Sequence, residues 1–577
     1  MNRTYFTGRF LRSALCVILM LTMLLGMTAC TTPPATTLAP SSTPAQMQTQ
    51  PTTAVPTTPP TTLPTTAPTE PTQPTEPEPE PEPLVYELTQ EDVDAFYSLL
   101  DACEQLSLVG EDLDAIDAAT AELDEMYEYL NAQCTIAMIH HYCHTLDATL
   151  EERYLDCVDI CTDANDAYIQ MTRRVYLSDT PAKDHLFEGW TQQDFDDLLA
   201  YDEQIAALNQ RNAEIEVEYR TTYSDDVRIP LYIEFVQNNN AIARFYGYDN
   251  YYDYASERIY ERDYGADSIA LMRQYAKDHL VPSFQTALEN FTNRFYNRLG
   301  YTDQKAVVDF LYEGYDTLAT NYVHSYMDVM PESMALQMNH MLKLDSVFTD
   351  AIDAEAGAFT TSIGERSYCY FGPGYASSST VIHEGGHYYA SRYTDLGAIP
   401  LDLAEVHSQG NEWLFTRYMK DVLPIAQYNA LKDYLLYEDS AMILICLMVD
   451  EFEQIVYTTD LTGYTAADFD AIMDTVSKRY FPRGYKKDDL TDLNSYWRMV
   501  VVEQPVYYIS YAVSSVAAMS LFTAANNDFE AAMATYQKLC EEPVEDGGFL
   551  DNLRAAGLAT PFEEEFYLQL KALAGVK

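Results

Sequence analysis

Residues 377–393 read SSSTVIHEGGHYYASRY and place two histidines, His383 and His387, four positions apart. On an α-helix such residues lie one above the other, so both imidazole rings can reach one metal ion. The serines and the threonine that precede them are suitable N-cap residues, which favours a helix here. The residue after the first histidine, Glu384, then lies beside the ion and can accept a proton from a water molecule. The pattern predicts a zinc site, with one ion per chain and Glu384 as general base.

Two adjacent glycines, Gly385 and Gly386, separate the histidines. Glycine in a helix interior costs roughly 1 kcal/mol relative to alanine, so something other than helix stability favours it. Close approach of a neighbouring strand or of a substrate to the backbone is one such reason. If Gly385 borders the substrate, Gly385→Leu changes specificity. If only packing is involved, we expect this substitution to be harmless.

A third zinc ligand is expected downstream, because a catalytic zinc ion takes three protein ligands and keeps one open position. The segment 400–415, PLDLAEVHSQGNEWLF, contains two candidates. Glu405 lies 18 residues after His387, enough to end one helix, turn and begin an antiparallel one. Glu412, seven residues later on the same face, is either a rival ligand or a partner behind the ligands. Alternatively, Asp402 and Glu405 form a capping box, and Glu405 only caps its own helix.

Helical periodicity dominates the chain after residue 84. In residues 111–130, EDLDAIDAATAELDEMYEYL, apolar side chains recur every three or four positions, as in an amphipathic helix. The same periodicity recurs in 135–180, 190–220, 230–255, 265–298, 303–320, 425–458 and 525–540. The best strand candidate is Arg366 to Phe371, RSYCYF, which alternates and lies between glycines. We predict a mostly α-helical domain with a small β-sheet over residues 85–577.

The first 84 residues have a different character. Residues 1–29 combine arginines with a short apolar core, as in an export signal. They end before Cys30 in LGMTAC, which resembles the lipobox of bacterial lipoproteins and predicts lipidation of Cys30. The alternatives are an ordinary signal peptide cut near Ala29, or an uncut anchor. Residues 30–84, rich in Thr, Pro and Glu, cannot bury a core and predict a disordered tether. We expect an extracytoplasmic protein, lipid-anchored to the bacterial cell membrane.

The net charge also limits the function. With 89 acidic and 34 basic residues, the formal charge is −55. A nucleic-acid-binding protein needs a cationic surface, so that class is excluded. A polybasic lipid-binding patch is disfavoured for the same reason, which leaves the acyl chain on Cys30 as the membrane contact. Eight cysteines follow the tether, too few for a disulfide scaffold, and their pairing cannot be deduced from the sequence.

Several segments resemble the oligoendopeptidase F and thimet oligopeptidase family of zinc metallopeptidases. STVIHEGGHYY (379–389) and LAEVHSQGNEW (403–413) match the family's His-Glu-x-Gly-His, its later Glu-x-x-Ser, and a second Glu seven residues after the first. QPVYYISYAVSSVAAMSL (504–521) is similar to the family's C-terminal helix, whose tyrosines hold the substrate carbonyl. AIARFYGYDNYYDYA (241–255) is a less specific match. The resemblance covers roughly residues 85–577.

The resemblance implies two helical lobes around a deep substrate channel, an N-terminal helical part (about 85–230) and a catalytic part (about 231–577). It implies a monomeric zinc endopeptidase that acts on short peptides. The residues implied for the site are the zinc ligands His383, His387 and Glu405, the base Glu384, and the catalytic tyrosines Tyr507, Tyr508 and Tyr511. We further expect an extended peptide to pair with the strand Arg366–Phe371 as an added strand, with Arg366 and Tyr368 binding it.

The spacing of the tyrosines also suggests a role for them, independent of the resemblance. Pro505 suits the first turn of a helix, in which Tyr507 and Tyr511 are at i and i+4 and Tyr508 and Tyr511 are at i and i+3, so that Tyr511 shares a face with either. A phenol on that face can donate a hydrogen bond to a developing oxyanion. Since the chain has 47 tyrosines, most of them must be structural.

Two features depart from the family pattern. The interval of 18 residues between His387 and Glu405 is shorter than usual, and Val501 stands where relatives often carry a histidine. The second departure supports a different hypothesis, a peptide-binding lipoprotein with lost or weak catalytic activity. The intact His-Glu-x-x-His segment opposes it, because a protein that only binds peptides does not need a general base.

Overall fold

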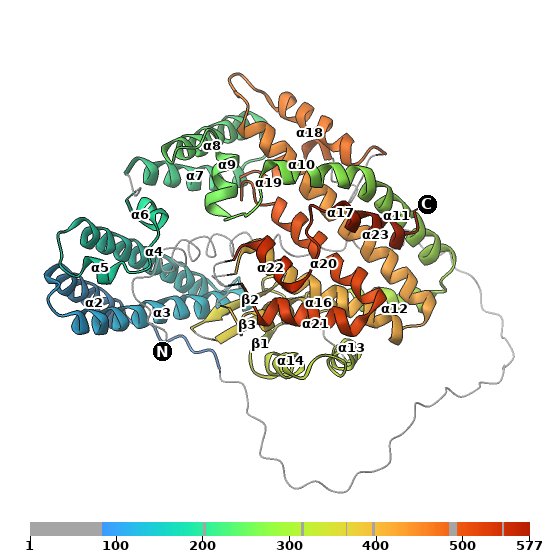
Figure 1. The fold of residues 1–577 in the computed structure, drawn as a ribbon, viewed down its shortest axis with the longest axis horizontal. Helices are drawn as coiled ribbons and strands as arrows, with labels where there is room; N and C mark the ends of the chain where they lie inside the picture. The colour runs from blue at the N-terminus through green and yellow to red at the C-terminus, as the bar shows by residue number, and fades with distance from the viewer. Residues whose placement is uncertain are drawn as a thin grey trace, which may run out of the picture.

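A computed structural model describes residues 83–199, 203–312, 317–364, 366–394, 399–483, 493–502, 504–544 and 547–576. The export signal, Cys30 and nearly all of the tether lie outside these residues. Figure 1 shows the described chain as a helical protein with one small sheet, which confirms the predicted fold class.

The elements before the sheet are all helical. The N-terminal helices are α2 (Gln90–Val109), α3 (Leu113–Cys143), α4 (Ala148–Leu177), α5 (Lys183–Leu186), α6 (Gln192–Leu199) and α7 (Glu203–Thr221). They are followed by α8 (Asp225–Phe245), α9 (Tyr251–Tyr254), α10 (Ala266–Tyr275), α11 (Val281–Asn297), α12 (Tyr301–Tyr312), α13 (Thr317–Met327) and α14 (Glu332–Leu344). Two π-helical turns, η2 (Ala255–Ile259) and η3 (Ala276–Leu280), continue α9 and α10.

The second half of the chain contains the sheet and the long core helices. The strands are β1 (Ser346–Phe348), β2 (Ala358–Ile363) and β3 (Arg366–Phe371). The helices after them are α15 (Ser378–Ala390), α16 (Leu401–Val422), α17 (Ile425–Tyr457), α18 (Ala466–Tyr480), α19 (Trp497–Val500), α20 (Ile509–Asn527), α21 (Phe529–Glu541), α22 (Phe549–Ala556) and α23 (Glu564–Ala574), with a short 3-10 turn, η5 (Leu493–Ser495), before α19.

A smaller lobe, formed by α2 to α6, lies at the left of Figure 1 and has its own apolar core. Its helices begin at side-chain caps: Thr89 forms a capping box with Asp92, and Asp112 and Asp147 cap α3 and α4. The apolar faces of α2, α3 and α4 pack on one another around Leu123. The helical periodicity over 135–180 therefore belongs to two helices, because α3 ends at Cys143 and α4 begins at Ala148.

The larger lobe contains a second core, built around α17 and α20. In α17 the run from Ile443 to Val449 is buried on every side, so this helix crosses the interior. α20 is nearly as buried, with α16 packed along it and α21 against it. α20 also has the length and apolar composition of a membrane span, but 83% of it lies inside the protein, as expected for a core helix.

The sheet lies between the two cores. Its strand order is β1-β3-β2, with β1 parallel and β2 antiparallel to β3. Tyr370 of β3 and Phe359 of β2 stack with ring centroids 5.1 Å apart in the core of the smaller lobe. Cys369 and Phe371, on the opposite face of β3, belong to the core of the larger lobe. The alternation predicted for this strand is thus confirmed.

β3 is the middle strand of the sheet. It pairs with β2 along its whole length and with β1 over Cys369–Phe371. An added peptide strand needs a free sheet edge, so a peptide cannot pair along Cys369–Phe371, while pairing at residues 366–368, beyond the end of β1, remains a prediction. Among the described strands, the edges are β1 and β2.

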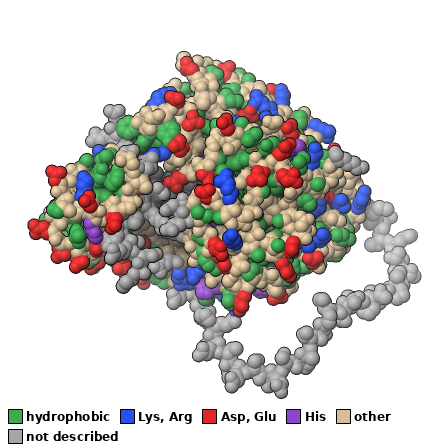
Figure 2. Space-filling model, in the orientation of Figure 1, with side chains coloured by type: hydrophobic (Ala, Val, Ile, Leu, Met, Phe, Trp, Pro, Cys, Tyr) green, Lys and Arg blue, Asp and Glu red, His purple; other side chains and the backbone are tan. Residues whose placement is uncertain are grey.

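Acidic side chains are spread over both lobes on the face seen in Figure 2, without gathering in one patch. This distribution fits a solvated anionic surface rather than a focused binding site for a cation. The eight cysteines of the described chain are free thiols, and seven of them are buried. The structure of the described part therefore depends on its two cores and not on disulfides.

Candidate active site

The His-Glu-Gly-Gly-His segment lies on α15, as its pattern predicts. The side chain of Ser377 caps the helix by accepting a hydrogen bond from the backbone N–H of Thr380 at 3.2 Å. Most of α15 is buried, against α16 on one side and the sheet and α14 on others. A helix in this position must accept neighbours at short distances, and this explains its glycines.

The two glycines have different neighbours. A Cβ at Gly386 would lie 2.4 Å from the carbonyl oxygen of His407 and 2.7 Å from the Cα of Ser408, both backbone atoms of α16. A Cβ at Gly385 would lie 2.2 Å from the sulfur of Met338, a flexible side chain of α14. Gly386 thus permits the approach of two helices, and Gly385 leaves space for a core methionine. Neither observation concerns a substrate.

Glu405, from the first turns of α16, meets the two histidines of α15. The ligand atoms of His383, His387 and Glu405 all lie within 4.8 Å of one another, and His383 Nε2 is 3.8 Å from Glu405 Oε2. The two imidazole rings are 5.1 Å apart and nearly perpendicular. Two imidazoles and one carboxylate are a donor set that suits zinc in a catalytic site, so these residues fit the predicted ion.

The alternative interpretation of Glu405 as a helix cap is wrong. The N-cap position of α16 is Pro400, and no side chain caps the helix. Asp402 lies within the first turn, where it is buried and accepts a hydrogen bond from Tyr264 at 2.6 Å. Glu405 instead points toward the histidines and accepts a 3.2 Å hydrogen bond from the hydroxyl of Ser408. The serine of the Glu-x-x-Ser segment therefore holds the carboxylate in place.

Glu412 lies behind the histidine pair. Its carboxylate is 2.7 Å from His383 Nδ1 and accepts a 2.5 Å hydrogen bond from Ser379. This contact leaves Nε2 of His383 facing Glu405. Such a carboxylate fixes the ring and increases its basicity as a ligand. Of the two roles left open for Glu412, the geometry favours the partner behind the ligands.

Glu384 is buried, and its environment suits a proton acceptor. Thr360 of β2 donates a 2.7 Å hydrogen bond to its carboxylate. Burial raises the pKa of Glu384 to about 7, although the neighbouring His383 opposes this shift. A carboxyl group with a pKa near neutrality can both accept and return a proton.

The two histidines differ electrostatically. Burial lowers the pKa of His387 to about 4, so this ring is neutral and ready to bind a metal. Burial also acts to lower the pKa of His383, but the hydrogen bond to Glu412 and the surrounding carboxylates raise it to about 10. A cation bound between these carboxylates replaces the proton that they otherwise favour on His383.

The tyrosines lie at the start of α20, which begins at Ile509 and not at Pro505. The expected helical turn is therefore wrong, and Tyr507 precedes the helix. Its hydroxyl nevertheless lies 3.1 Å from that of Tyr511, and the rings of Tyr508 and Tyr511 are 6.4 Å apart. The three form one cluster, and their catalytic role remains a prediction.

α20 is held in register against α16, the helix that carries Glu405. The hydroxyl of Ser514 donates to the carbonyl of Asp402 at 2.7 Å, and that of Ser515 donates to the side-chain oxygen of Gln409 at 2.8 Å. Asp402 lies one turn before Glu405 on α16, and Ser514 lies one turn after Tyr511 on α20. The tyrosine cluster is thus fixed close to the beginning of the ligand-bearing helix.

Arg366 and Tyr368, the residues predicted to bind a peptide, have partners within the protein. Arg366 lies 2.5 Å from Asp345 and above the ring of Tyr368, 5.2 Å from its centroid. Asp345 also accepts a hydrogen bond from Tyr388 at 2.6 Å. Arg366 thereby ties the sheet to α15, and peptide binding by these two residues remains a prediction. Val501 is fully buried in the larger core.

Several supporting residues of the site could not be predicted from the sequence. Thr360, which contacts Glu384, comes from a strand that was not predicted. Asn411 donates a 2.8 Å hydrogen bond to the carbonyl of Ile382, one residue before the first histidine, and Tyr326 donates to Asn411 at 3.1 Å. Of these three residues, only Asn411, next to Glu412, lies in a segment that resembles the family motif.

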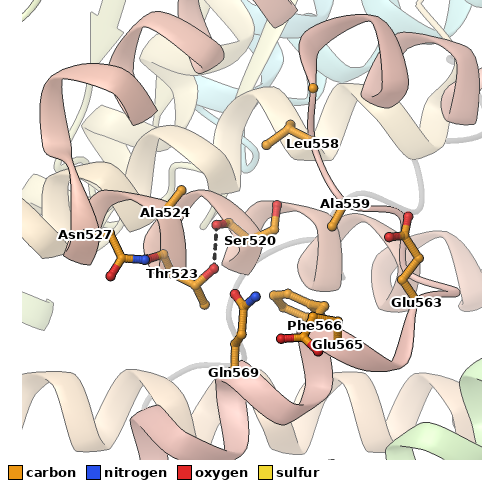
Figure 3. Close-up of a pocket in the computed structure, with 11 residues that line it drawn as sticks. Ser520, Thr523, Ala524, Asn527, Leu558, Ala559, Glu563, Glu565, Phe566 and Gln569 are labelled. Atoms are coloured by element: carbon orange, nitrogen blue, oxygen red, sulfur yellow. Dashed lines mark hydrogen bonds between the residues drawn. The ribbon is translucent and has the colours of Figure 1, made fainter.

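A separate cavity of about 300 Å³ opens at the other end of α20 (Figure 3). Its wall includes Ser520, Asn527 and Phe566, together with two glutamates, Glu563 and Glu565. There the side chains of Ser520, Thr523 and Asn527 donate hydrogen bonds to backbone carbonyls of α20 itself. This cavity lies roughly 18 Å along the helix from the tyrosine cluster, at about 1.5 Å per residue, and is separate from the candidate site.

The fold is shared with solved peptidase structures. PZ peptidase A in complex with an inhibitor superimposes with a TM-score of 0.65 at 17% identity, over 85% of this chain and 98% of that one. A protein of Bacillus anthracis described as an oligoendopeptidase F gives 0.63 at 17% identity, over 85% and 96%. Oligoendopeptidase F of Enterococcus faecium gives 0.50 at 13% identity, over 85% and 98%. No protein-family model and no curated protein sequence matches the chain.

Proposed function

We propose that the protein is a zinc-dependent endopeptidase that hydrolyses short peptides. The observation that carries this proposal is the convergence of His383, His387 and Glu405, with the buried Glu384 next to the first histidine. The likeness to PZ peptidase A and to oligoendopeptidase F in fold gives independent support. Zinc, one ion per chain, is the cofactor, and the chain acts as a monomer.

The chain's own residues divide the chemistry among them. His383, His387 and Glu405 would hold the zinc ion, which when bound supplies Lewis-acid chemistry, polarising a carbonyl oxygen and lowering the pKa of water. Glu384 accepts a proton from the attacking water and transfers it to the leaving amine. Phenol hydroxyls of Tyr508 and Tyr511 donate hydrogen bonds to the developing oxyanion.

The substrate lies between the two lobes in this proposal. β2 is an edge of the sheet, and its Thr360 hydrogen-bonds the carboxylate of Glu384. An extended peptide paired with β2 would therefore pass beside the general base. A channel between lobes admits a flexible chain more readily than a folded protein, and this is why we propose short peptides as substrates.

The proposed location is outside the cytoplasmic membrane, with Cys30 as the lipid anchor and residues 30–84 as the tether. Support comes from the sequence alone. Expression in a bacterial host with a labelled fatty acid tests the anchor: label is expected in the wild-type protein and not in Cys30→Ser, which is expected in a soluble fraction. Label in both proteins would contradict lipidation at Cys30.

Metal analysis and peptide cleavage test the activity. We expect about one zinc ion per purified chain and cleavage of a quenched fluorescent peptide. Glu384→Gln is expected to retain the zinc and to lose nearly all activity, because an amide cannot accept the proton. Equal turnover in both proteins, or no bound zinc, would contradict the proposal. If the wild type and the variant bind peptide equally and neither cleaves it, the result would favour the alternative hypothesis of a peptide-binding lipoprotein.

A further inference from the structure

Two non-glycine residues of the described chain have a left-handed backbone, Glu261 with φ 46° and Val506 with φ 66°. This conformation is unfavourable for residues with a side chain, and most of all for a β-branched one such as valine. It persists only where the surroundings impose it. The two residues are far apart in sequence. A contact nevertheless links their segments, because Arg262, which follows Glu261, donates a hydrogen bond to the carbonyl of Val506.

Val506 is held through both of its peptide groups. Its backbone N–H donates to the carboxylate of Glu453 at 3.0 Å, and its carbonyl accepts from Nη2 of Arg262 at 2.8 Å. The hydroxyl of Tyr260 donates to the carbonyl of Pro505 at 3.0 Å. Three side chains from outside the segment therefore fix the turn that leads directly into Tyr507.

Arg262 also contacts the two helices of the candidate site. Its Nη2 donates to the hydroxyl of Ser510 in α20 at 2.8 Å, and its Nε lies 3.8 Å from a carboxylate oxygen of Asp402 in α16. Asp402 lies one turn before Glu405. The guanidinium is fully buried and lies 4.4 Å from the ring centroid of Tyr260. One side chain thus connects the tyrosine segment with the helix that carries a zinc ligand.

A guanidinium is well suited to this task. Its donors point in fixed directions within one plane, so Arg262 can donate to a carbonyl and to a hydroxyl while its charge faces the carboxylate of Asp402. A lysine ammonium is a compact charge on a flexible stem and does not reproduce that geometry. Burying an arginine is expensive, and a protein keeps one only where several partners compensate for the lost water.

We infer that Arg262 is a positioning residue of the active site: together with Glu453 it holds Val506 in its left-handed turn and so sets where the tyrosine hydroxyls lie relative to Glu405. The expected effect on catalysis rests on the proposed peptidase function, whereas the contacts of Arg262 with the tyrosine segment do not depend on it. A displacement of about 1 Å in a catalytic group can lower a rate on the order of 100-fold.

The test compares Arg262→Met with Arg273→Met in the full chain. Arg273 is the matched control: it is a buried arginine that pairs with Asp450 and Gln454, and within the described chain no hydrogen bond or ion pair joins it to residues 504–511. For Arg262→Met we expect kcat on a quenched peptide to fall roughly 100-fold, with a much smaller change in KM and with unchanged zinc content. For Arg273→Met we expect a comparable decrease in Tm and a kcat close to that of the wild type.

Hydrogen exchange gives a readout that does not need activity. We expect faster exchange in a peptide spanning 504–511 of Arg262→Met, and wild-type exchange there in Arg273→Met. Arg262→Lys, which keeps the charge and disturbs folding less, is expected to show the same change in exchange. If the wild-type chain proves inactive, this comparison still decides whether Arg262 holds the segment.

A glycine at position 506 provides a second test, because glycine adopts the left-handed conformation without penalty. In the double variant that carries both Arg262→Met and Val506→Gly, we expect part of the kcat that Arg262→Met alone loses to be restored. Equal effects of Arg262→Met and Arg273→Met on kcat, or unchanged exchange over 504–511 in both Arg262 variants, would overturn the inference. Loss of zinc from Arg262→Met would do so as well, since the residue would then support the metal ligands rather than the tyrosines.

Discussion

The carboxylate of Glu412 contacts Nδ1 of His383 at 2.7 Å, and Nε2 of the same ring lies 3.8 Å from Glu405. One ring thus joins a glutamate behind the site to a glutamate within it. The arrangement fixes which nitrogen of His383 is available to a metal. It explains why the second glutamate of the motif lies seven residues after the first, on the same face of α16.

Removing the glutamate behind the site is expected to weaken metal binding without abolishing it. In Glu412→Ala the ring of His383 loses its orienting partner, and such losses typically lower metal affinity about 10- to 100-fold. Competition between the protein and a chromogenic chelator measures this change. Ser379→Ala, which removes only the donor to Glu412, is expected to have a smaller effect. An unchanged affinity in Glu412→Ala would mean that the contact does not orient the ring.

The tyrosines are expected to affect turnover rather than binding. Loss of one hydrogen-bond donor to an oxyanion typically lowers kcat about 100- to 1,000-fold. We expect a loss of this size for Tyr511→Phe or Tyr508→Phe, with little change in KM. Tyr507→Phe removes a contact with Tyr511 and is expected to cost less. If KM rises while kcat is unchanged, the affected tyrosine binds substrate and does not stabilise the transition state.

The two glycines of α15 are expected to respond differently to alanine. Gly386→Ala places a methyl group against the backbone of α16, which cannot move without displacing Glu405. Overpacking of this kind typically costs 1–3 kcal/mol or more, and we expect both Tm and zinc affinity to fall. Gly385→Ala meets the end of the Met338 side chain, which can change rotamer, so a smaller loss is expected.

Gly385→Leu separates packing from specificity. The leucine would collide with Met338, so we expect a lower Tm and an unchanged pattern of cleaved peptides. The sequence alone predicts a harmless substitution if only packing is involved, whereas the close approach of Met338 predicts a loss of stability. A changed cleavage pattern at an unchanged Tm would show that position 385 borders the substrate after all.

The stability of the smaller lobe is expected to depend on Asp124. Burial raises the pKa of this carboxyl from 3.8 to about 6, while the hydrogen bond from Tyr168 opposes the shift. Between these values the folded chain keeps a proton that the unfolded chain has lost, so stability falls as pH rises from about 4 to 6. Asp124→Asn removes this loss and keeps an acceptor for Tyr168.

Thermal unfolding at pH 4 and pH 7.5 measures the effect. We expect Asp124→Asn to match the wild type at pH 4 and to be more stable at pH 7.5, by on the order of 2 kcal/mol. Glu128→Gln, which removes a negative charge near Asp124, is expected to lower the pKa of Asp124 and give a smaller gain. A variant less stable than the wild type at pH 7.5 would show that the ionised carboxylate is favourable there.

The parts of the site that local sequence determines were predictable. The spacing of His383 and His387 is a property of one helix, and Glu405 followed from a motif on the next. The strand Arg366–Phe371 was found with its correct bounds because glycines delimit it. β1 has only three residues, and its pairing with β3 depends on a contact across more than twenty residues, so no local pattern indicates it.

The parts that depend on tertiary contacts were missed. Pro505 is a good first residue for a helix, but Glu453 and Arg262 hold the next residue, Val506, in a left-handed turn, and α20 starts only at Ile509. Likewise, the sequence predicts that Asp402 caps a helix, whereas in the structure its carboxylate accepts a hydrogen bond from Tyr264 and faces the guanidinium of Arg262. These groups come from distant parts of the chain, and no spacing within a single segment brings them together.

The alternation along β3 has a thermodynamic consequence. Tyr370 is buried in the core of the smaller lobe and Phe371 in that of the larger one, so one strand contributes a face to each core. Loss of either core would expose one apolar face of the sheet, and the free energy of that exposure couples the two transitions. We therefore expect calorimetry to show one cooperative transition for the described chain, with equal calorimetric and van't Hoff enthalpies, in spite of its two cores.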